Sequence, residues 1–254
     1  MSNNKITAKN LSVGYGEKII IKNASFEVKN NDIFIIMGGS GCGKSTMLKV
    51  LTGLMPPIRG EFFINDINYC RANDDTKLEI MKKIGILYQS GGLFSSMTLA
   101  ENVALPLQKY SSYSPKTIDD LVNLKLALVG LNGYNDYYPS EISGGMKKRA
   151  GLARALALDP EIVFFDEPSA GLDPLSSARL DNLMKEINQN LGTTLVVVTH
   201  ELQSIFDIAT NSIFLSGETK TIEAYGNPND LLKNPPNENV FNFLTRGKNN
   251  EKTA

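Results

Sequence analysis

The chain has 254 residues, of which 42% are hydrophobic, a composition that suffices for one large α/β domain with an inserted subdomain. Its 26 Lys and Arg residues almost balance its 27 Asp and Glu residues, which argues against a nucleic-acid binder with many phosphate contacts. No apolar run approaches the roughly 20 residues of a membrane-spanning helix, and the first residues lead into no signal peptide, so we expect a cytosolic chain. Cys42 and Cys70 are too few and too poorly spaced for a disulfide framework or a zinc site.

Strand-like segments at residues 5–8 and 24–28 flank a turn at residues 13–17, a pattern that favours an antiparallel flap. Tyr15 lies in this turn between Gly14 and Gly16. Its ring could be an ordinary exposed aromatic or a platform on which an adenine stacks. The motif that follows in the chain favours the stacking role.

A glycine-rich segment follows an apolar strand at residues 32–37 and precedes a helix at residues 46–51. It fits the pattern G-x-x-x-x-G-K-[ST], in which backbone N–H groups, a lysine and a helix N-terminus surround phosphate groups while the serine hydroxyl serves Mg²⁺. For Cys42, a small residue that fits the loop is favoured over a reactive thiol. We therefore expect a nucleotide-binding loop made of Gly38, Gly39, Ser40, Gly41, Cys42, Gly43, Lys44, Ser45 and Thr46.

Residues 60–65 resume strand character and add a strand to the flap, and residues 71–82 are polar and compatible with a helix. Residues 84–88 predict another buried strand, which ends at Gln89. Open α/β sheets bind ligands at the carboxyl ends of their strands, so the Gln89 amide could contact a metal or a water near phosphate. The alternative is an ordinary polar residue at a strand end.

A helical pattern begins at Thr98, where Thr98 and Glu101 form a capping box, and Ser114-Pro115 begins a second helix. These helices predict a helical subdomain that interrupts the sheet over about residues 95–160.

Within this region, Ser143, Gly144 and Gly145 open a basic helix that reaches about Leu158. Its start is a second place in the chain where an anion could bind. Taken by itself, the segment is explained by an ordinary capped helix start.

Residues 162–165 are apolar at every position and predict a central strand that delivers Asp166 and Glu167 to the ligand edge of the sheet. Two carboxylates beside a nucleoside triphosphate require a cation. We therefore interpret Asp166 as a Mg²⁺ ligand and Glu167 as the group that polarises the attacking water. Solvated acids at a strand end are the alternative, which the preceding apolar run disfavours.

Asp173 and Pro174 predict the N-cap and the first residue of the next helix, a structural role that explains them fully. Residues 193–199 repeat the central-strand pattern and present His200, the only histidine of the chain. A lone histidine is usually incidental. This one follows a strand at the edge predicted to hold Asp166, where an imidazole could reach a γ-phosphate or order the water.

Residues 212–215 and 221–224 predict closing strands, Pro228 begins a short helix, and residues 233–239 form a linker. Beyond the linker, Val240–Leu244 is a small apolar patch before a polar tail that we expect to be frayed. Since so short a segment cannot form a core alone, we expect it to pack on a neighbouring subunit.

In order and spacing, these motifs resemble those of the ATP-binding cassette (ABC) ATPases over about residues 5–230. The resemblance implies an α/β fold with a P-loop NTPase (RecA-like) core, an N-terminal antiparallel β subdomain and an inserted α-helical subdomain. One ATPase domain would span residues 1–233, followed by a linker and tail over residues 234–254. The implied cofactors are ATP and Mg²⁺.

The resemblance also assigns roles to individual positions. Tyr15 would stack on adenine, Glu167 would be the catalytic base, and His200 would be the switch histidine. Gln89 would be the Q-loop glutamine, which serves both catalysis and the metal, and Asp173 would be the D-loop aspartate at the nucleotide. The metal ligands would be Ser45, Gln89 and Asp166.

A head-to-tail homodimer is implied as well. Ser143, Gly144 and Gly145 of one protomer would close over the γ-phosphate held by Lys44 of the other. Loss of that phosphate on hydrolysis removes charge-assisted hydrogen bonds of about 1.5–3 kcal/mol each, which would let the dimer open.

Finer features are similar to the MlaF-type ATPases of bacterial Mla/Mce phospholipid transporters, namely residues 88–94, residues 101–107, Met146 followed by basic residues, and residues 240–244. That similarity implies phospholipid transport between the inner and outer membranes. The implied partners are an MlaE-like permease whose cytosolic helix docks beside Gln89, an MCE-domain lipid-binding subunit and often a STAS-domain subunit. The chain would then lie peripherally on the cytoplasmic side of the inner membrane.

Two other classes stay open. One is the ATPase subunit of another ABC importer or exporter, for amino acids or metal chelates. The other is a soluble ABC ATPase of DNA repair or translation, which would need a long coiled-coil insertion, a second cassette or a basic surface. The sequence contains none of these three features.

Overall fold

The structure is a computed structural model of the chain and describes residues 3–247. The described residues form two compact units: the first contains the chain up to Ala72 and from Val196 onward, and the second contains Asn73–Leu195. Residues 248–254, the end of the predicted polar tail, lie outside the described part of the chain.

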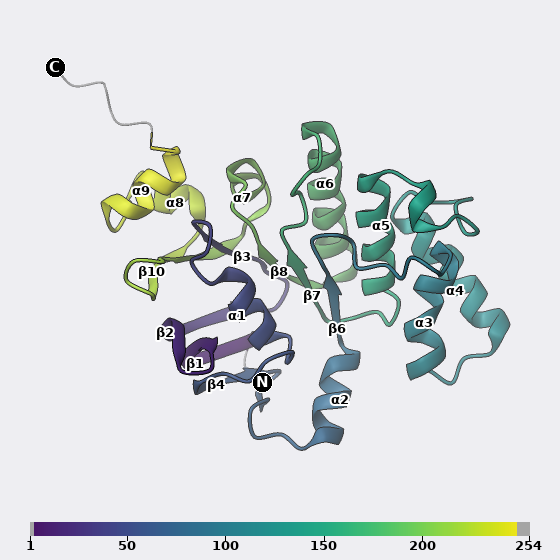
Figure 1. Cartoon of the computed structure of the whole chain (residues 1–254), viewed down its shortest axis with the longest axis horizontal. Helices are drawn as coiled ribbons and strands as arrows, with labels where there is room; N and C mark the ends of the chain where they lie inside the picture. The colour runs from purple at the N-terminus through teal and green to yellow at the C-terminus, as the bar shows by residue number, and fades with distance from the viewer. Residues whose placement is uncertain (1–2, 248–254) are drawn as a thin grey trace. The chain divides into compact units, whose positions relative to one another are not determined.

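An antiparallel sheet with the order β2-β1-β4-β5 opens the first unit. Its strands are β1 (Asn4–Tyr15), β2 (Lys18–Lys29), β4 (Arg59–Ile64) and β5 (Ile67–Asn68). This confirms the predicted flap and its added strand, and it shows that β1 and β2 extend well beyond the predicted segments. Helix α1 (Lys44–Leu51) lies beside this sheet (Figure 1).

Strand β3 (Ile33–Gly38) is buried at every position, as its apolar sequence predicts, and pairs in parallel with β9 (Asn211–Leu215). Strand β10 (Ile222–Gly226) pairs antiparallel with β9. The rings of Phe34 on β3 and Phe26 on β2 stack with their centroids 5.7 Å apart, so the two sheets of this unit share one core.

Strand β8 (Thr194–Val198) contains the boundary between the units. At its start, the amide of Thr194 donates to the carbonyl of Glu161 at 3.1 Å, within the second unit. Beyond its end, the amide of Thr199 donates to the carbonyl of Ile36 on β3 at 3.3 Å, within the first unit.

In the second unit, β7 (Ile162–Asp166) pairs in parallel with β6 (Ile84–Leu87). The four apolar positions of β7 are buried, as predicted. The prediction of a fully buried strand at residues 84–88 is wrong in part, because β6 ends at Leu87 and leaves Ile84 and Ile86 half-buried. An edge strand, as β6 is, has a neighbour on only one side.

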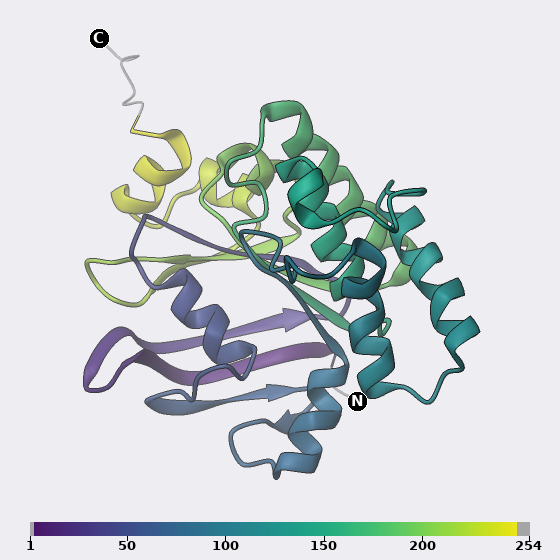
Figure 2. The same ribbon diagram turned by 45° about the vertical axis from the view of Figure 1, so that its right-hand side comes forward.

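The helices of the second unit begin where their caps predict. Thr98 and Glu101 form the predicted capping box of α3, and the side chain of Ser114 caps α4. Figure 2 shows α3, α4 and α5 side by side. Helix α5 ends at Ala155, before the predicted Leu158. The bounds are α2 (Asp74–Lys82), α3 (Leu99–Tyr110), α4 (Pro115–Leu128), the 3₁₀ turn η1 (Pro139–Glu141), α5 (Gly144–Ala155) and α6 (Pro174–Leu191).

Helices α7 (Leu202–Ile208), α8 (Pro228–Lys233) and α9 (Glu238–Thr245) complete the first unit. Helix α9 corrects the expectation for the apolar patch: Val240 and Leu244 are buried within this chain, and the ring of Phe243 lies 5.1 Å from that of Phe214 on β9. Val240 and Leu244, one helical turn apart, share a buried face of α9, and Phe243 beside them is the residue that contacts β9. Over residues 3–247, no helix is long and apolar enough to cross a membrane.

Candidate functional site

The glycine-rich loop connects β3 to α1, as predicted, and contains three glycines in backbone conformations that other residues rarely adopt. Gly38, Gly41 and Gly43 have positive φ angles of 152°, 75° and 110°. A Cβ atom at Gly38 would lie 2.3 Å from the carbonyl oxygen of Leu215, so only glycine fits there. The loop therefore keeps a backbone-lined shape that a phosphate can enter.

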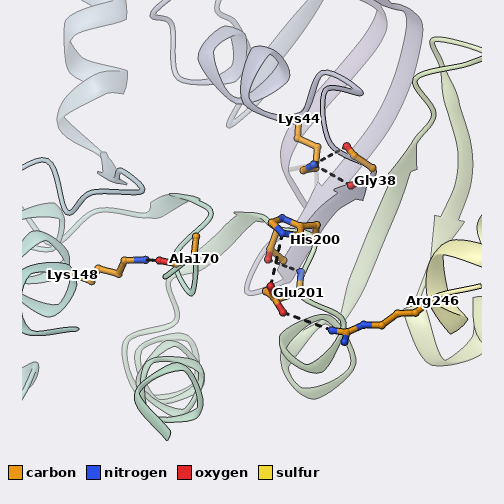
Figure 3. Close-up of polar contacts among 9 residues, drawn as sticks. Gly38, Lys44, Lys148, Ala170, His200, Glu201 and Arg246 are labelled. Carbon is orange, nitrogen blue, oxygen red and sulfur yellow. Dashed lines mark hydrogen bonds and ion pairs between the residues drawn. The ribbon is translucent and has the colours of Figure 1, made fainter. Parts of the chain in front are cut away.

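Lys44 begins α1 and is buried except for 7% of its surface. Its Nζ atom donates to the carbonyl oxygens of Gly38 and Gly39, both at 3.0 Å (Figure 3). The loop thus holds the ammonium group against its own backbone. The oxygens of an incoming phosphate could replace the two carbonyl oxygens as its hydrogen-bond partners. Ser45 follows on the exposed side of the helix start.

Tyr15 lies at the end of β1 with half of its surface exposed. Its hydroxyl lies 3.3 Å from Nζ of Lys49 on α1. Hydrogen bonds from the side chains of Thr46 and Lys49 lower the pKa of the Tyr15 phenol. Two side chains of α1 therefore orient the tyrosine beside the nucleotide loop and leave its ring exposed for stacking.

His200 follows β8 in the first unit, with its side chain about half exposed. Its Nε2 atom lies 3.8 Å from Oε1 of Glu201, and Oε2 of Glu201 lies 3.8 Å from Arg246 just beyond α9 (Figure 3). The predicted switch histidine thus lies beside Glu201, which in turn pairs with Arg246 at the end of the C-terminal helix.

Asp166 ends β7 in the second unit, and Glu167 follows directly. Glu167 has a φ angle of 48°, in the left-handed region that glycine, asparagine and aspartate usually occupy. Strained backbone of this kind costs about 1–3 kcal/mol and is common at functional sites. The buried strand therefore presents both carboxylates at its carboxyl end, the second one on a strained turn.

The predicted second anion site is the N-terminus of α5. Ser143 is its N-cap, and its Oγ atom accepts a hydrogen bond from the amide of Met146 at 3.2 Å. Ser143 and Gly144 are exposed, and a Cβ atom at Gly144 would meet nothing within 4 Å. The helix start is therefore open to an anion from outside the chain.

Gln89 is exposed in the segment after β6. A groove of about 530 Å³ begins one residue before it, at Tyr88, within the second unit. The groove is lined by α2, β6, α3 and α5, and its lining is mostly apolar with the basic residues Lys82, Lys109 and Arg154 among it. The chain between β6 and α3 is held by Asn102, which is fully buried and donates to the carbonyls of Phe94, Met97 and Thr98.

Asp173 is the N-cap of α6, as predicted, and accepts hydrogen bonds from the amides of Leu175 and Ser176 at 3.1 and 3.0 Å. Hydrogen bonds from the side chain and the amide of Ser176 lower the pKa of the Asp173 carboxyl. Its structural role is thus established, and its role at a nucleotide stays a prediction.

The structure brings the predicted residues together in two sets. In the first unit, α1 connects Tyr15 to the loop Gly38–Thr46. Lys49 on this helix contacts Tyr15, and Lys44 at its start donates to the carbonyl of Gly38. In the second unit, the segment from Asp166 to Asp173 lies against α5, where a Cβ atom at Gly145 would lie 3.8 Å from Leu172. Their catalytic and binding roles remain predictions.

The sequence reasoning missed Lys148, which is buried on α5 and bound to the segment after Glu167. A signal existed, because Lys148 and the apolar Leu152 are four residues apart and must share a helix face. The partners of Lys148 are backbone carbonyl oxygens, which leave no trace in the sequence.

The residues present fit ATP with Mg²⁺. A backbone-lined loop with a buried lysine suits a polyphosphate. No group of three or more His, Cys, Asp or Glu side chains that could hold a metal ion occurs in the described part of the chain. The predicted ligands Ser45, Gln89 and Asp166 offer a hydroxyl, an amide and a carboxylate, oxygen donors that suit Mg²⁺ when phosphate and water supply the rest.

A family model described as "ABC transporter" matches residues 21–170. The intermembrane phospholipid transport system ATP-binding protein MlaF of Haemophilus influenzae is 39% identical over 233 residues, which are 92% of this chain and 88% of that protein. MlaF of Escherichia coli K12 is 37% identical over 91% of this chain and 86% of that protein. The probable ribonucleotide transport ATP-binding protein mkl of Mycobacterium leprae is 41% identical over 78% of this chain, but over only 57% of its own length.

Among solved structures, an ATP-binding cassette in a dimeric post-hydrolysis state with ADP and Pi superposes with a TM-score of 0.79. It is 31% identical, and the match covers 87% of this chain and 98% of that one. The cassette cbiO1 from Clostridium perfringens superposes with a TM-score of 0.83 over 92% of this chain and 93% of its own; at 23% identity, it supports the fold alone.

Proposed function

Because the chain belongs to the ABC transporter family and is one of its ATPases, we propose that it powers phospholipid transport between the inner and outer membranes of a bacterium. The observation that carries this proposal is the similarity to two MlaF proteins over nearly their whole length. The matches cover 92% and 91% of this chain, so they extend beyond the residues that every ATPase of this kind needs.

ATP binding would use the residues of the first unit. The ring of Tyr15 would stack on the adenine, and the amides of Gly38–Thr46 would surround the phosphates. Lys44, held at the loop by two carbonyl oxygens 3.0 Å away, would move its hydrogen bonds to the β- and γ-phosphates. Little of the binding geometry would have to form on arrival of the nucleotide, which favours binding.

Hydrolysis would need a base for the attacking water and a partner for the γ-phosphate. Glu167 would polarise the water, and His200 would donate to the γ-phosphate or hold the water in line with it. Gln89 would contact the water and the metal. Mg²⁺ would neutralise charge on the phosphates, held by Ser45, Gln89 and Asp166.

The exposed start of α5 supports a head-to-tail homodimer. Ser143, Gly144 and Gly145 of one protomer would bind the γ-phosphate that Lys44 of the other protomer holds. The contact exists only while the γ-phosphate is present, so hydrolysis would remove it and favour opening. Because this contact is present before hydrolysis and absent after it, ATP turnover would close and open the dimer and thereby move the subunits bound to it.

Partner subunits would supply the path for the lipid. The mostly apolar groove beside Gln89 has the size and the character to receive a helix of an MlaE-like membrane permease. A periplasmic MCE-domain subunit and a STAS-domain subunit are further expected partners. The chain would then lie peripherally on the cytoplasmic side of the inner membrane.

The test is purification of the chain with its partners from membranes. We expect it to copurify with a multispanning permease, the complex to contain phospholipid, and added phospholipid vesicles to change its ATPase rate. A complex that contains no phospholipid and whose ATP turnover ignores vesicles would contradict the proposal.

The similarity to mkl favours a second candidate, in which the cargo is a ribonucleotide. This candidate is weaker because the match covers only part of that protein. ATPase assays of the same complex with uridine or adenosine monophosphate in place of vesicles separate the two cargoes: the phospholipid proposal expects no response to either nucleotide.

A further inference from the structure

Lys148 is a buried ammonium group on α5. Only 6% of its surface is exposed, although lysine is among the residues that are least often buried. Burial lowers the pKa of the Lys148 ammonium, and the nearby Glu167 carboxylate partly opposes this effect. A charge in such a place is costly unless specific partners hold it.

The partners of Lys148 are two backbone carbonyls in one short segment. Its Nζ atom donates to the oxygen of Pro168 at 2.6 Å and to the oxygen of Ala170 at 2.5 Å (Figure 3). The segment is a series of tight turns, in which the amide of Ala170 donates to the backbone carbonyl of Glu167 and the amide of Leu172 donates to the backbone carbonyl of Ser169. The lysine is thus the cross-link between this segment and α5.

The two ends of that cross-link are the predicted functional elements of the second unit. The segment begins at Glu167, whose left-handed backbone requires support, and ends at Asp173, the N-cap of α6. Helix α5 begins at Ser143, where the γ-phosphate of a partner protomer would bind under the proposed function. One ammonium group therefore connects the helix that senses a partner's nucleotide to the turn that carries the proposed base.

We propose that Lys148 is a positioning residue that holds Glu167 in its strained turn and makes this turn move together with the N-terminus of α5. The inference rests on the proposed function, in which Glu167 is the base and α5 contacts the nucleotide of the partner. A cross-link through two backbone carbonyls fixes the path of the turn whatever side chains it carries. Closure of a dimer on α5 would then place Glu167 without a separate ordering step.

The first test compares two variants. Lys148→Met removes the charge and the hydrogen-bond donors but keeps the length of the side chain, whereas Lys148→Arg keeps the charge and the donors. Lys147→Met, a half-buried neighbour on the same helix, is the matched control. ATPase kinetics are measured on the full chain in its membrane complex. Since misplacing a catalytic group by about 1 Å can cost about 10²-fold, we expect kcat of Lys148→Met to fall about tenfold or more.

The KM for ATP should change less than about twofold, because ATP would be bound by the loop of the first unit and only the chemical step is affected. Lys148→Arg should recover at least about a third of the wild-type kcat, since arginine keeps the charge and the donors. Wild-type kcat in Lys148→Met, or a raised KM with an unchanged kcat, would overturn the inference.

The second test does not depend on turnover. Hydrogen–deuterium exchange of the full chain without nucleotide should show the amides of Ala170 and Leu172 exchanging at least about fivefold faster in Lys148→Met and unchanged in Lys147→Met. Unchanged exchange would overturn the cross-link even if the wild type hydrolyses ATP. Faster exchange in a chain whose wild type has no ATPase activity would instead support the cross-link and contradict the proposed function. If Lys148→Met does not fold, Lys148→Gln is measured in the same two ways.

Discussion

The Tyr15 ring contacts Lys49 on α1, next to the nucleotide loop, and still exposes half of its surface. Stacking of a base on an aromatic ring contributes about 1–3 kcal/mol. It does not require the phenol hydroxyl, which here serves to orient the ring.

Tyr15→Ala should therefore weaken ATP binding about tenfold or more, since about 1.4 kcal/mol corresponds to a factor of ten. Tyr15→Phe should keep affinity within about threefold. Titration calorimetry with ATP, in a background that carries Glu167→Gln to prevent turnover, measures both. Equal affinities for the alanine and phenylalanine variants would refute the stacking role.

Lys148 leads to a prediction about pH. Burial lowers its pKa below the ordinary value of 10.5, with Glu167 opposing the shift. As pH rises through the folded pKa, Lys148 loses its charge while the same group in an unfolded chain would still be protonated. Stability of the fold is thus gained over this window, so a fall in activity there would come from the lost ammonium group and not from unfolding.

We expect the ATPase rate of the wild type to decline toward alkaline pH sooner than the rate of Lys148→Arg, because the guanidinium group stays charged throughout. Rates are measured from pH 7 upward, with thermal melts at each pH as the control for folding. Superimposable alkaline limbs for the two proteins would count against a charged Lys148 in the active state.

The elements of the fold follow closely from the local sequence where local rules determine them. Thr98, Ser114 and Asp173 each cap the helix that they predict, because a cap is a contact between near neighbours in the chain. The four apolar residues of β7 also predict their strand, because an uninterrupted apolar run is a local pattern typical of strands covered on both faces. Features that depend on distant partners were predicted less well.

Helix α9 and Lys148 are the clearest cases. Val240 and Leu244 form an obvious apolar face, but only the fold shows that this face is buried within the same chain and that the neighbouring Phe243 contacts β9. The carbonyl partners of Lys148 belong to every residue type and leave no pattern to recognise. The motifs of the site could be identified one by one, and their grouping into two compact units could not.

The packing of α9 predicts that the C-terminal helix stabilises the chain itself. Burial of a Val or Leu side chain contributes about 1.5–3 kcal/mol, and α9 buries one of each. Truncation after Lys233 should lower the melting temperature of the isolated full-length chain by about 5 °C or more.

Truncation after Gly247 is the matched control, since it removes none of these contacts. Scanning calorimetry of the three proteins tests the prediction. An unchanged melting temperature together with weaker assembly of the complex would mean that α9 serves a neighbouring subunit after all.

On the scale of the whole molecule, we expect the chain to work as one protomer of a dimer. Its nucleotide loop and its α5 start belong to different compact units, and a similar cassette has been solved as a dimer with ADP and Pi. A dimer that closes on ATP must stay closed when the γ-phosphate cannot be removed, because the contact that holds it shut then persists. The variant that should separate ATP binding from hydrolysis is Glu167→Gln, which keeps the shape of the side chain and removes the proposed base.

Glu167→Gln should hydrolyse ATP at least about 10²-fold more slowly than the wild type, the usual loss when a general base is removed. With ATP it should elute as a dimer in size-exclusion chromatography with light scattering, whereas the wild type returns to the open form as it turns ATP over. Glu161→Gln is the matched control, because this carboxylate precedes β7 and pairs with Lys83 at 3.0 Å. It should hydrolyse ATP at the wild-type rate. Normal turnover in Glu167→Gln would remove Glu167 from the role of base, and slow turnover without an ATP-dependent dimer would place the work of this ATPase outside dimer closure.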